Sequence, residues 1–312
     1  MKFPRYVKVL ISVLFSMLAL VLVVLFVDIQ LLNPAEYSIQ WLLFGVSSAL
    51  FLANYIFRSA RFREFLTGEV SHRSLLGVSL VHGALNYFFP LKMGELSFPL
   101  LSRFFLGRTL LESGAALILC RILDLFLVLA LFVLVLFVWD GSHRLLVDLG
   151  LSDTGIVWVA LSIAFGIGVV SIVLFHKRFG LHQRVLAKVS NVSGFGVRML
   201  VRLAIVTSLI WCCILGNFYF LAACLGYQIP LAAMVMVSVV MTPLSLIPVQ
   251  GFANVGTFEL AWVSGLVLFG FSNNESLEIA IKVHILLTIQ VIAMLGLGAL
   301  LLAAGKLGDR YA

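Results

Sequence analysis

Two short polar segments interrupt long apolar runs in this 312-residue chain, and they carry most of the side chains that could do chemistry. The first reads N-Y-F-F-P-L-K-M-G-E and covers Asn86–Glu95; the second covers Pro243–Glu259. Proline lacks an N–H and glycine permits unusual backbone angles, so both segments should end a helix and free backbone polar groups. Irregular backbone at membrane depth is tolerated only where protein packs on it or where it lines a wet cavity. The pattern therefore predicts a polar cavity at the two breaks.

The charged residues of the first break are Lys92 and Glu95, next to Gly94. A charge near the bilayer centre costs about 2.5–3.5 kcal/mol on the insertion scale, so we expect these charges to be paired. Asn86 adds a hydrogen-bonding side chain to the segment. The alternative is a cytoplasmic loop in which both charges are solvated.

The second break offers amide side chains at Gln250 and Asn254, followed by Gly256 and Glu259. Each break thus has the order Pro, Gly, Glu. Both carboxylates could face the cavity, and either could carry a proton if burial raised its pKa. The alternative is helix capping at both places, because a carboxylate is favoured in the first turn of a helix.

Three further charges fall near these breaks. Arg121 and Asp124 are three residues apart in one apolar run, so they are predicted to pair on neighbouring faces of a helix, either as a structural clamp or with a direct role. Arg103 follows the first break, where a guanidinium could bind phosphate oxygens in a bidentate manner. His82 and His284 are more typical of packed residues than of ligands.

The composition requires a membrane environment for these side chains. The chain is 62% apolar and only 11% charged, whereas soluble domains are about 25% charged. A spanning helix needs about 20 apolar residues. The predicted spans are Val9–Val27, Ile39–Phe57, Thr109–Val138, Ile156–Phe175, Leu203–Leu225 and Ile279–Ala304. Four shorter apolar stretches form two broken pairs: Leu75–Phe89 with Phe98–Leu106, and Leu231–Ile247 with Phe258–Phe269.

The distribution of basic residues sets the expected orientation. Lys and Arg concentrate in cytoplasmic loops of membrane proteins. Most of the 21 basic residues surround positions that a single orientation places on the cytoplasmic side, including Arg58 and Arg61 after the second span. Both termini are predicted to be cytoplasmic in a multi-pass protein of the inner or plasma membrane, with 178–198 along the interface. The net charge of +7 then reflects topology, so no nucleic-acid partner is expected.

The expected fold is an all-α integral membrane protein, a polytopic helical bundle with two inverted repeats that contain broken or re-entrant helices. The whole chain, 1–312, forms one transmembrane domain. It comprises an N-terminal span (9–27), repeat one (39–138), a connecting span with an interfacial helix (156–202) and repeat two (203–304). Inverted repeats with interrupted helices are a recurring plan of transporters, although polytopic chains with short loops show some such parity by chance.

Several classes of enzyme site lack their motifs. The chain has no G-x-x-x-x-G-K-[ST] or G-x-G-x-x-G loop, no D-x-D pair, no G-x-S-x-G elbow and no H-E-x-x-H. The four cysteines lie in apolar runs, where neither a disulfide framework nor a zinc set is expected. We therefore expect no enzyme activity, no cofactor and no metal.

The motifs themselves resemble a known family. The run from Asn86 to Glu95, then Arg103, the Arg121–Asp124 pair, and P-L-S-L-I-P-x-Q-G-x-x-N-x-G-x-x-E at Pro243–Glu259 are similar to the lysylphosphatidylglycerol synthase transmembrane-region family, also described as flippase-like. The resemblance covers essentially the whole chain and implies a protein that moves or binds lipids. The cytosolic aminoacyltransferase domain of bifunctional members is absent from this sequence. Relatives often carry an Arg soon after the first Glu, where this chain has Phe98 and Pro99.

The leading hypothesis is a lipid translocase that moves an anionic phospholipid, a glycolipid or a polyprenyl-phosphate lipid through the cavity. A membrane-embedded glycosyl or acyl transferase and a non-catalytic scaffold remain alternatives. A membrane lipid is the expected substrate; a second copy of the chain or a lipid-biosynthesis enzyme is a candidate partner. The expected substrate-binding or translocation residues are Asn86, Lys92, Gly94, Glu95, Arg103, Arg121, Asp124, Gln250, Asn254, Gly256 and Glu259.

Overall fold

The computed structural model describes residues 38–138, 197–244 and 250–311. The predicted spans at 9–27 and 156–175, and the interfacial segment at 178–198 apart from its last two residues, lie outside this part. The described residues form helices without a strand. The helices are α2 (Trp41–Arg63), α3 (His72–Phe88), η3 (Pro90–Leu96), α4 (Ser97–Leu106), α5 (Leu110–Val138), α9 (Val197–Cys224), α10 (Leu231–Leu244), η4 (Phe252–Asn254), α11 (Thr257–Val267) and α12 (Asn273–Tyr311).

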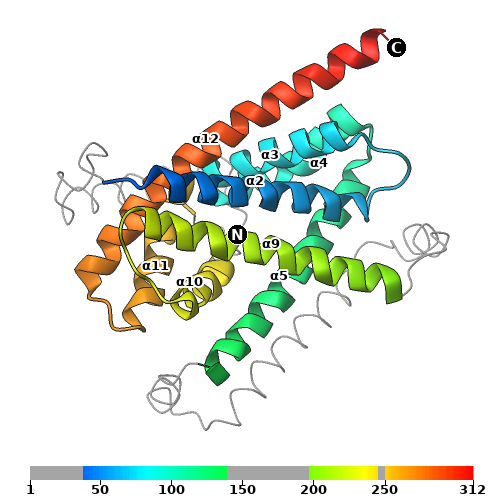
Figure 1. The fold of residues 1–312 in the computed structure, drawn as a ribbon. Coiled ribbons are helices and arrows are strands. Elements are labelled where there is room, and N and C mark those ends of the chain that lie inside the picture. Colours follow the sequence, from blue (N-terminus) through cyan, green and yellow to red (C-terminus); the bar gives the residue numbers. More distant parts are fainter. Residues whose placement is uncertain (1–37, 139–196, 245–249, 312) are drawn as a thin grey trace, which may run out of the picture.

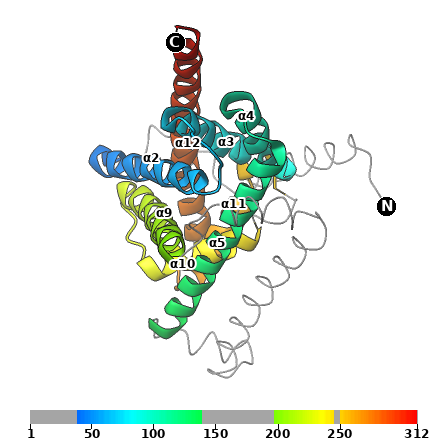
Figure 2. The ribbon, with the colours of Figure 1, turned by 90° about the vertical axis from the view of Figure 1, so that its right-hand side faces the viewer.

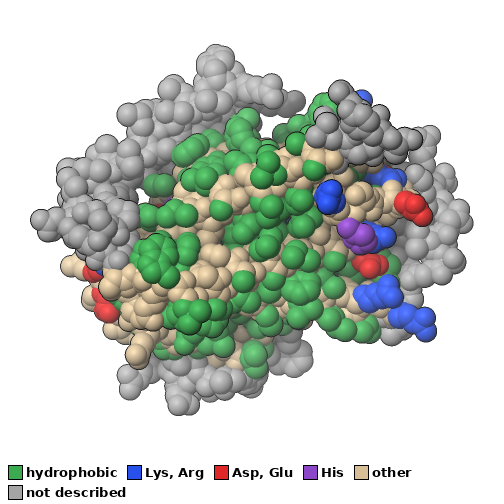
Figure 3. All heavy atoms as spheres, turned by 45° about the horizontal axis from the view of Figure 1, so that its top comes forward, with side chains coloured by type: hydrophobic (Ala, Val, Ile, Leu, Met, Phe, Trp, Pro, Cys, Tyr) green, Lys and Arg blue, Asp and Glu red, His purple; other side chains and the backbone are tan. Residues whose placement is uncertain are grey.

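Four of these helices are long and apolar enough to cross a membrane, which confirms the all-α membrane fold. They are Trp41–Arg63, Leu110–Val135, Val201–Cys224 and Asn273–Ala304. Hydrophobic side chains cover much of the middle of the described face in Figure 3, while charged side chains lie toward its edges. This distribution matches an apolar solvent around the middle of the bundle. The four predicted short stretches also form separate helices, namely α3 and α4 before and after the first break, and α10 and α11 before and after the second.

The first helices of the two predicted repeats, α2 and α9, run side by side in opposite directions (Figures 1 and 2). Gln40 N–H donates to the Cys224 carbonyl at 2.9 Å, and Ser47 Oγ donates to Asn217 Oδ1 at 2.6 Å. Gln290 Nε2 of α12 donates to Ser47 Oγ at 2.9 Å, so one polar chain joins three helices. Such interhelical hydrogen bonds matter in lipid because apolar burial against lipid tails gives little driving force.

Helices of each half also pack on helices of the other half. Helix α3 of the first half packs on α12 of the second, and α5 of the first half packs on α10 of the second. At the α3–α12 crossing, Gly77 and Gly298 bring the backbones together: a Cβ built on either residue would lie 3.2 Å from the carbonyl oxygen of the other. Small residues permit this approach in membrane helices. Two inverted halves would place their first helices antiparallel, as α2 and α9 are. The inverted relation of the complete repeats stays a prediction.

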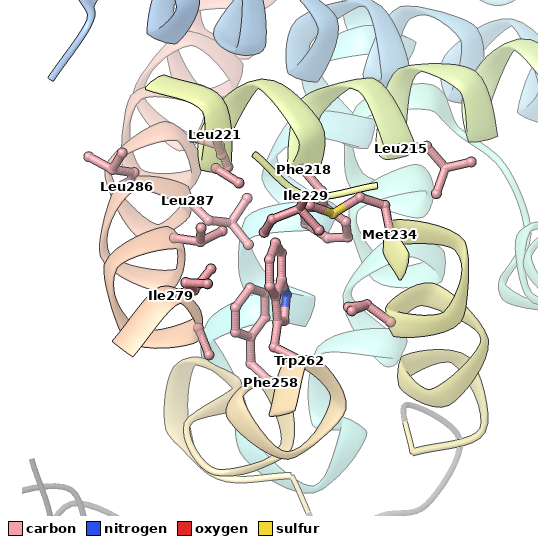
Figure 4. Packing of buried hydrophobic residues seen from close by; sticks show 14 of the residues in the cluster. Leu215, Phe218, Leu221, Ile229, Met234, Phe258, Trp262, Ile279, Leu286 and Leu287 are labelled. Carbon is pink, nitrogen blue, oxygen red and sulfur yellow. The ribbon is translucent and has the colours of Figure 1, made fainter. Parts of the chain in front are cut away.

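A large apolar core fills the second half (Figure 4). Trp262 of α11 is fully buried and lies between α9, α10 and α12, with Phe258 stacked on it at a centroid distance of 5.7 Å. Gly265 permits the close contact of α11 with α10, because a Cβ there would meet Val237 backbone atoms at 2.8 Å. This packing fixes α11, and with it the carboxylate of Glu259, against α12.

The first break differs from the expected geometry in one respect. The backbone turns into the short 3-10 helix η3 directly at Pro90, as expected. However, the left-handed φ of 61° belongs to Lys92, whereas Gly94 is needed for space: its Cβ would lie 2.3 Å from Asn86 Cα and 2.4 Å from the Leu85 carbonyl oxygen. Glycine at 94 therefore permits η3 to fold back on the end of α3.

Replacing Gly94 with Ala should destabilise the protein by about 3 kcal/mol, at the upper end of typical overpacking costs, because the clashing atoms are backbone and cannot move aside. Gly296→Ala is the matched control, since a Cβ there meets nothing within 4 Å. The control should change stability by less than about 1 kcal/mol. Unfolding in detergent, followed by intrinsic fluorescence, measures both variants; equal midpoints would contradict the packing role of Gly94.

Candidate functional site

A cavity of about 640 Å³ opens between the helices at the two breaks. Its lining comes from α2, α3, η3, α5, α9, α10, η4 and α12, so both halves of the chain contribute. Charged and polar groups share the walls with aromatic and aliphatic side chains. The polar lining residues are Asn54, Tyr55, Arg58, Ser79, His82, Asn86, Tyr87, Glu95, Arg121, Asp124, Trp211, Asn217, Ser238, Thr242 and Asn254.

The asparagines of the cavity follow the repeat plan. Asn54 and Asn217 lie on the first helices of the two halves, α2 and α9, while Asn86 and Asn254 lie at the two breaks. The Oδ1 atoms of Asn86 and Asn254 are buried and have no hydrogen-bond partner among the described residues. Buried polar atoms are normally satisfied, and unsatisfied ones at a cavity are a reasonable place for a ligand or water.

Glu95 pairs with Arg121 across the first break. The Arg121 guanidinium donates to Glu95 Oε1 at 2.6 Å, and the Lys92 ammonium lies 4.0 Å from the same oxygen. The expectation that Lys92 and Glu95 are paired is therefore confirmed, with Arg121 as the nearer partner. Because two cations flank it, this carboxylate is held in its charged form, which argues against Glu95 as the proton carrier considered from the sequence.

Asp124 pairs with Arg61, so the predicted Arg121–Asp124 pair is wrong. Arg61 donates to both carboxylate oxygens of Asp124, at 2.7 and 2.9 Å, and also to Thr207 Oγ1 at 3.2 Å. Trp211 Nε1 donates to Asp124 Oδ1 at 3.2 Å. One bidentate pair thus joins α2, α5 and α9. Spacing within one helix could not reveal a partner on another helix that offers two parallel hydrogen bonds.

Arg58 and Arg61 were not among the predicted site residues, because both follow the second predicted span and were assigned to a cytoplasmic connection. Helix α2 continues to Arg63, and the side chain of Arg61 is only 1% exposed. Arg58 lines the cavity and donates from Nε to Asn54 Oδ1 at 2.9 Å. A signal was present: Ser47, Asn54, Arg58 and Arg61 are spaced seven, four and three residues apart, which places them on one face of a helix.

Arg58 is the cavity cation without an acidic partner in the described ranges, where Glu95 is paired with Arg121 and Asp124 with Arg61. Counting Lys92 and Arg61, which contact the lining carboxylates, four cations face two anions. The cavity therefore carries an excess of positive charge in surroundings that screen it weakly.

Other predicted site residues lie away from the cavity lining. Arg103 is exposed on α4, and Gln250 is buried just before η4. Gly256 directly precedes α11 and has a φ of 87°, and its N–H donates to Glu259 Oε2 at 2.7 Å, so Glu259 caps this helix. Glu259 Oε1 lies 2.5 Å from His284 Nδ1. The helix-capping alternative describes Glu259, whereas Glu95 faces the cavity.

The family of the chain follows from its sequence match. The family model described as the lysylphosphatidylglycerol synthase TM region matches residues 9–296. The chain belongs to this family. No curated protein and no solved structure matches it. The match contains both breaks and every residue that lines the cavity, so the cavity lies within the membrane domain of this lipid-related family.

Replacing Asp124 with Asn should destabilise the protein by about 3–5 kcal/mol, because the buried Arg61 guanidinium would lose its counter-charge. The matched control is Glu64→Gln, since Glu64 lies 4.0 Å from the exposed Arg202 and such surface pairs contribute about 0–1 kcal/mol. Thermal unfolding in one detergent compares the two variants. A drop in the midpoint of D124N no larger than that of E64Q would rule out a structural role for the pair.

Proposed function

We propose that the protein is a lipid translocase whose cavity receives the headgroup of an anionic phospholipid, glycolipid or polyprenyl-phosphate lipid. The observation that carries this proposal is Arg58, a guanidinium on the wall of a membrane-embedded cavity with no carboxylate paired to it among the described residues. Guanidinium groups bind phosphate oxygens with strong, charge-assisted hydrogen bonds. An anionic headgroup would balance the positive excess.

The shape of the site fits a headgroup better than a whole lipid. A volume of about 640 Å³ lies within the range typical of small-molecule pockets. Exposed Leu, Ile and Phe side chains cover the outside of α5 and α9, including Phe126 and Ile205, where acyl chains would stay in lipid. The headgroup would cross through the cavity while the tails remain outside.

The break asparagines give the headgroup further contacts. Asn86 and Asn254 present unpartnered oxygens from opposite breaks, and these oxygens accept hydrogen bonds from hydroxyl or ammonium groups. In this arrangement the phosphate contacts Arg58 and the remaining headgroup contacts the asparagines. Movement of either break would change these contacts, as expected for sites at interrupted helices of transporters.

A liposome assay tests the proposal. The protein is reconstituted in vesicles that contain fluorescent phosphatidylglycerol, and dithionite quenching measures how fast the headgroup changes leaflet. We expect movement above that of protein-free vesicles, and slower movement of fluorescent phosphatidylcholine. Equal rates in protein-containing and empty vesicles for each anionic lipid tried would refute a translocase.

Arg58→Gln should slow phosphatidylglycerol movement by about tenfold or more, since a hydrogen bond to a charged group contributes about 1.5–3 kcal/mol. Arg103→Gln removes an exposed arginine outside the cavity and should retain the wild-type rate. Thermal unfolding verifies that both variants are folded. A wild-type rate for folded R58Q would exclude Arg58 from headgroup binding.

A further inference from the structure

A buried carboxylate and imidazole meet beside the second break, outside the cavity lining. Glu259 of α11 and His284 of α12 have side chains that are 10% and 7% exposed. Glu259 Oε1 lies 2.5 Å from His284 Nδ1, and the other ring nitrogen, Nε2, lies 2.9 Å from the Ala253 carbonyl oxygen. Phe258 stacks on the imidazole at a centroid distance of 4.3 Å. We call these two residues the Glu259–His284 dyad.

The geometry fixes the number of protons on the dyad. A carbonyl oxygen only accepts, so Nε2 must carry a proton and donate it to Ala253. The Nδ1–Oε1 contact needs a second proton, because two lone pairs would repel at 2.5 Å. Either an imidazolium donates to a carboxylate, or a protonated Glu259 donates to neutral Nδ1. Both forms hold one proton more than a neutral imidazole beside a free carboxylate.

The corresponding contact at the first break does not depend on a proton. In each half, the glutamate after the break contacts a basic residue on the last helix of that half: Glu95 contacts Arg121 on α5, and Glu259 contacts His284 on α12. Arginine stays charged in proteins, whereas histidine gains and loses its proton near neutral pH. The first contact is therefore permanent, whereas His284 can contact Glu259 and the Ala253 carbonyl at the same time only while the additional proton is bound.

The dyad holds the second break at both ends. His284 Nε2 donates to the Ala253 carbonyl, and the Gly256 N–H donates to Glu259 Oε2 at 2.7 Å. Asn254 lies between these two anchors and lines the cavity. Ala253 and Asn254 have φ values of 50° and 60°, a left-handed conformation that persists in such residues only when the surroundings hold it. Loss of the proton would leave His284 with a donor for only one of its two contacts, and loss of the hydrogen bond to the Ala253 carbonyl would release this strained segment.

The other ionisable groups near the dyad have partners of their own, so they do not take over the role of the proton between Glu259 and His284. From α3, the Tyr87 ring packs edge-on against His284 at 5.9 Å, and its hydroxyl is hydrogen-bonded to Thr288 Oγ1. On α12, Lys282 is paired with Glu278, and both contact the Tyr227 hydroxyl. The described parts of α10, η4 and α11 carry no other charged residue, and α9 presents Phe218 to Phe258.

We propose that Glu259 and His284 form a proton-binding site that holds the second break in the observed shape, and that release of the proton frees Asn254 and couples headgroup movement to a proton gradient. The coupling rests on the proposed function; the proton site does not. The proton leaves the Nδ1–Oε1 contact for water, which leaves a neutral imidazole, a carboxylate and one additional negative charge in the bundle. No bond other than that to the proton changes.

Nitrogen NMR of ¹⁵N-histidine-labelled protein in nanodiscs tests the proton site without any transport. His284→Asn identifies the His284 signals. We expect both ring nitrogens of wild-type His284 to shift together between pH 5 and 9. Glu259→Gln should shift that transition by at least one pH unit or remove it, because a glutamine amide donates to neutral Nδ1 without an added proton. Glu278→Gln, an acidic residue elsewhere on α12, should leave it unchanged.

Invariant His284 signals in folded wild-type protein, or the same transition in folded E259Q, would overturn the proton site. Release of the break is measured with Val255→Cys in a Cys212→Ser background, since Cys212 is the exposed one among the described cysteines. The rate of thiol labelling should rise at least fivefold over the pH range in which His284 titrates. A constant labelling rate would overturn the link between the proton and the break.

The coupling has its own readout in vesicles with an imposed pH gradient. Wild-type and E278Q protein should move phosphatidylglycerol at a rate that changes at least threefold with the gradient, whereas the rate of E259Q should not respond to it. A gradient-independent wild-type rate would overturn the coupling. If wild-type protein moved no lipid, the proposed function would fail, and the NMR transition would still decide whether the dyad binds a proton.

Discussion

The structure depends on the cost of placing charge inside an apolar bundle. An isolated charge is expensive in such surroundings, and a buried carboxylate is tolerated when a cation and further hydrogen-bond donors surround it. Asp124 meets this requirement with Arg61, Glu95 with Arg121, and Glu259 with His284. Each pair joins separate segments of the chain. The few charges of this protein therefore also determine which helices must be neighbours.

The three pairs differ in their chemistry and in their surroundings. The Arg61–Asp124 pair is bidentate, nearly inaccessible and shared with Thr207 and Trp211, which makes it a structural joint of α2, α5 and α9. The Glu95–Arg121 pair is more exposed and faces the cavity. The Glu259–His284 contact is the one whose two hydrogen bonds need a bound proton. One requirement, charge compensation, thus produces a structural contact between helices, a charged pair at the cavity wall and the pair that we propose binds a proton.

The two breaks of the helices are similar in sequence order but differ in backbone geometry. At the first, Lys92 adopts the left-handed conformation and Gly94 supplies space for close packing; at the second, Ala253, Asn254 and Gly256 share the positive φ values. The first is fixed by backbone contact with the end of α3. The second is held by side chains of α11 and α12. This difference makes the second break the one that a change in protonation can release.

The sequence by itself determined that the protein lies in lipid, which segments form helices and where these helices are interrupted. Apolar runs and Pro-Gly segments act locally, so the ends of the described helices follow from residues such as Pro90 and Gly256. The family also follows from sequence, since the motifs at Asn86–Glu95 and Pro243–Glu259 lie within the matched region. Five of the eleven predicted site residues line one cavity, namely Asn86, Glu95, Arg121, Asp124 and Asn254.

Only the tertiary structure decided which charges meet. Arg121 and Asp124 are close in sequence, yet each is hydrogen-bonded to a partner on another segment, Arg121 to Glu95 and Asp124 to Arg61. The bidentate geometry at Asp124 outweighs proximity along one helix. Arg58 and Arg61 looked like residues of a cytoplasmic connection because a local count of apolar residues ended the span too early. The contact of Glu259 with His284, 25 residues apart, depends on how α11 packs on α12. Long-range packing, which no local pattern encodes, set the chemistry of the site.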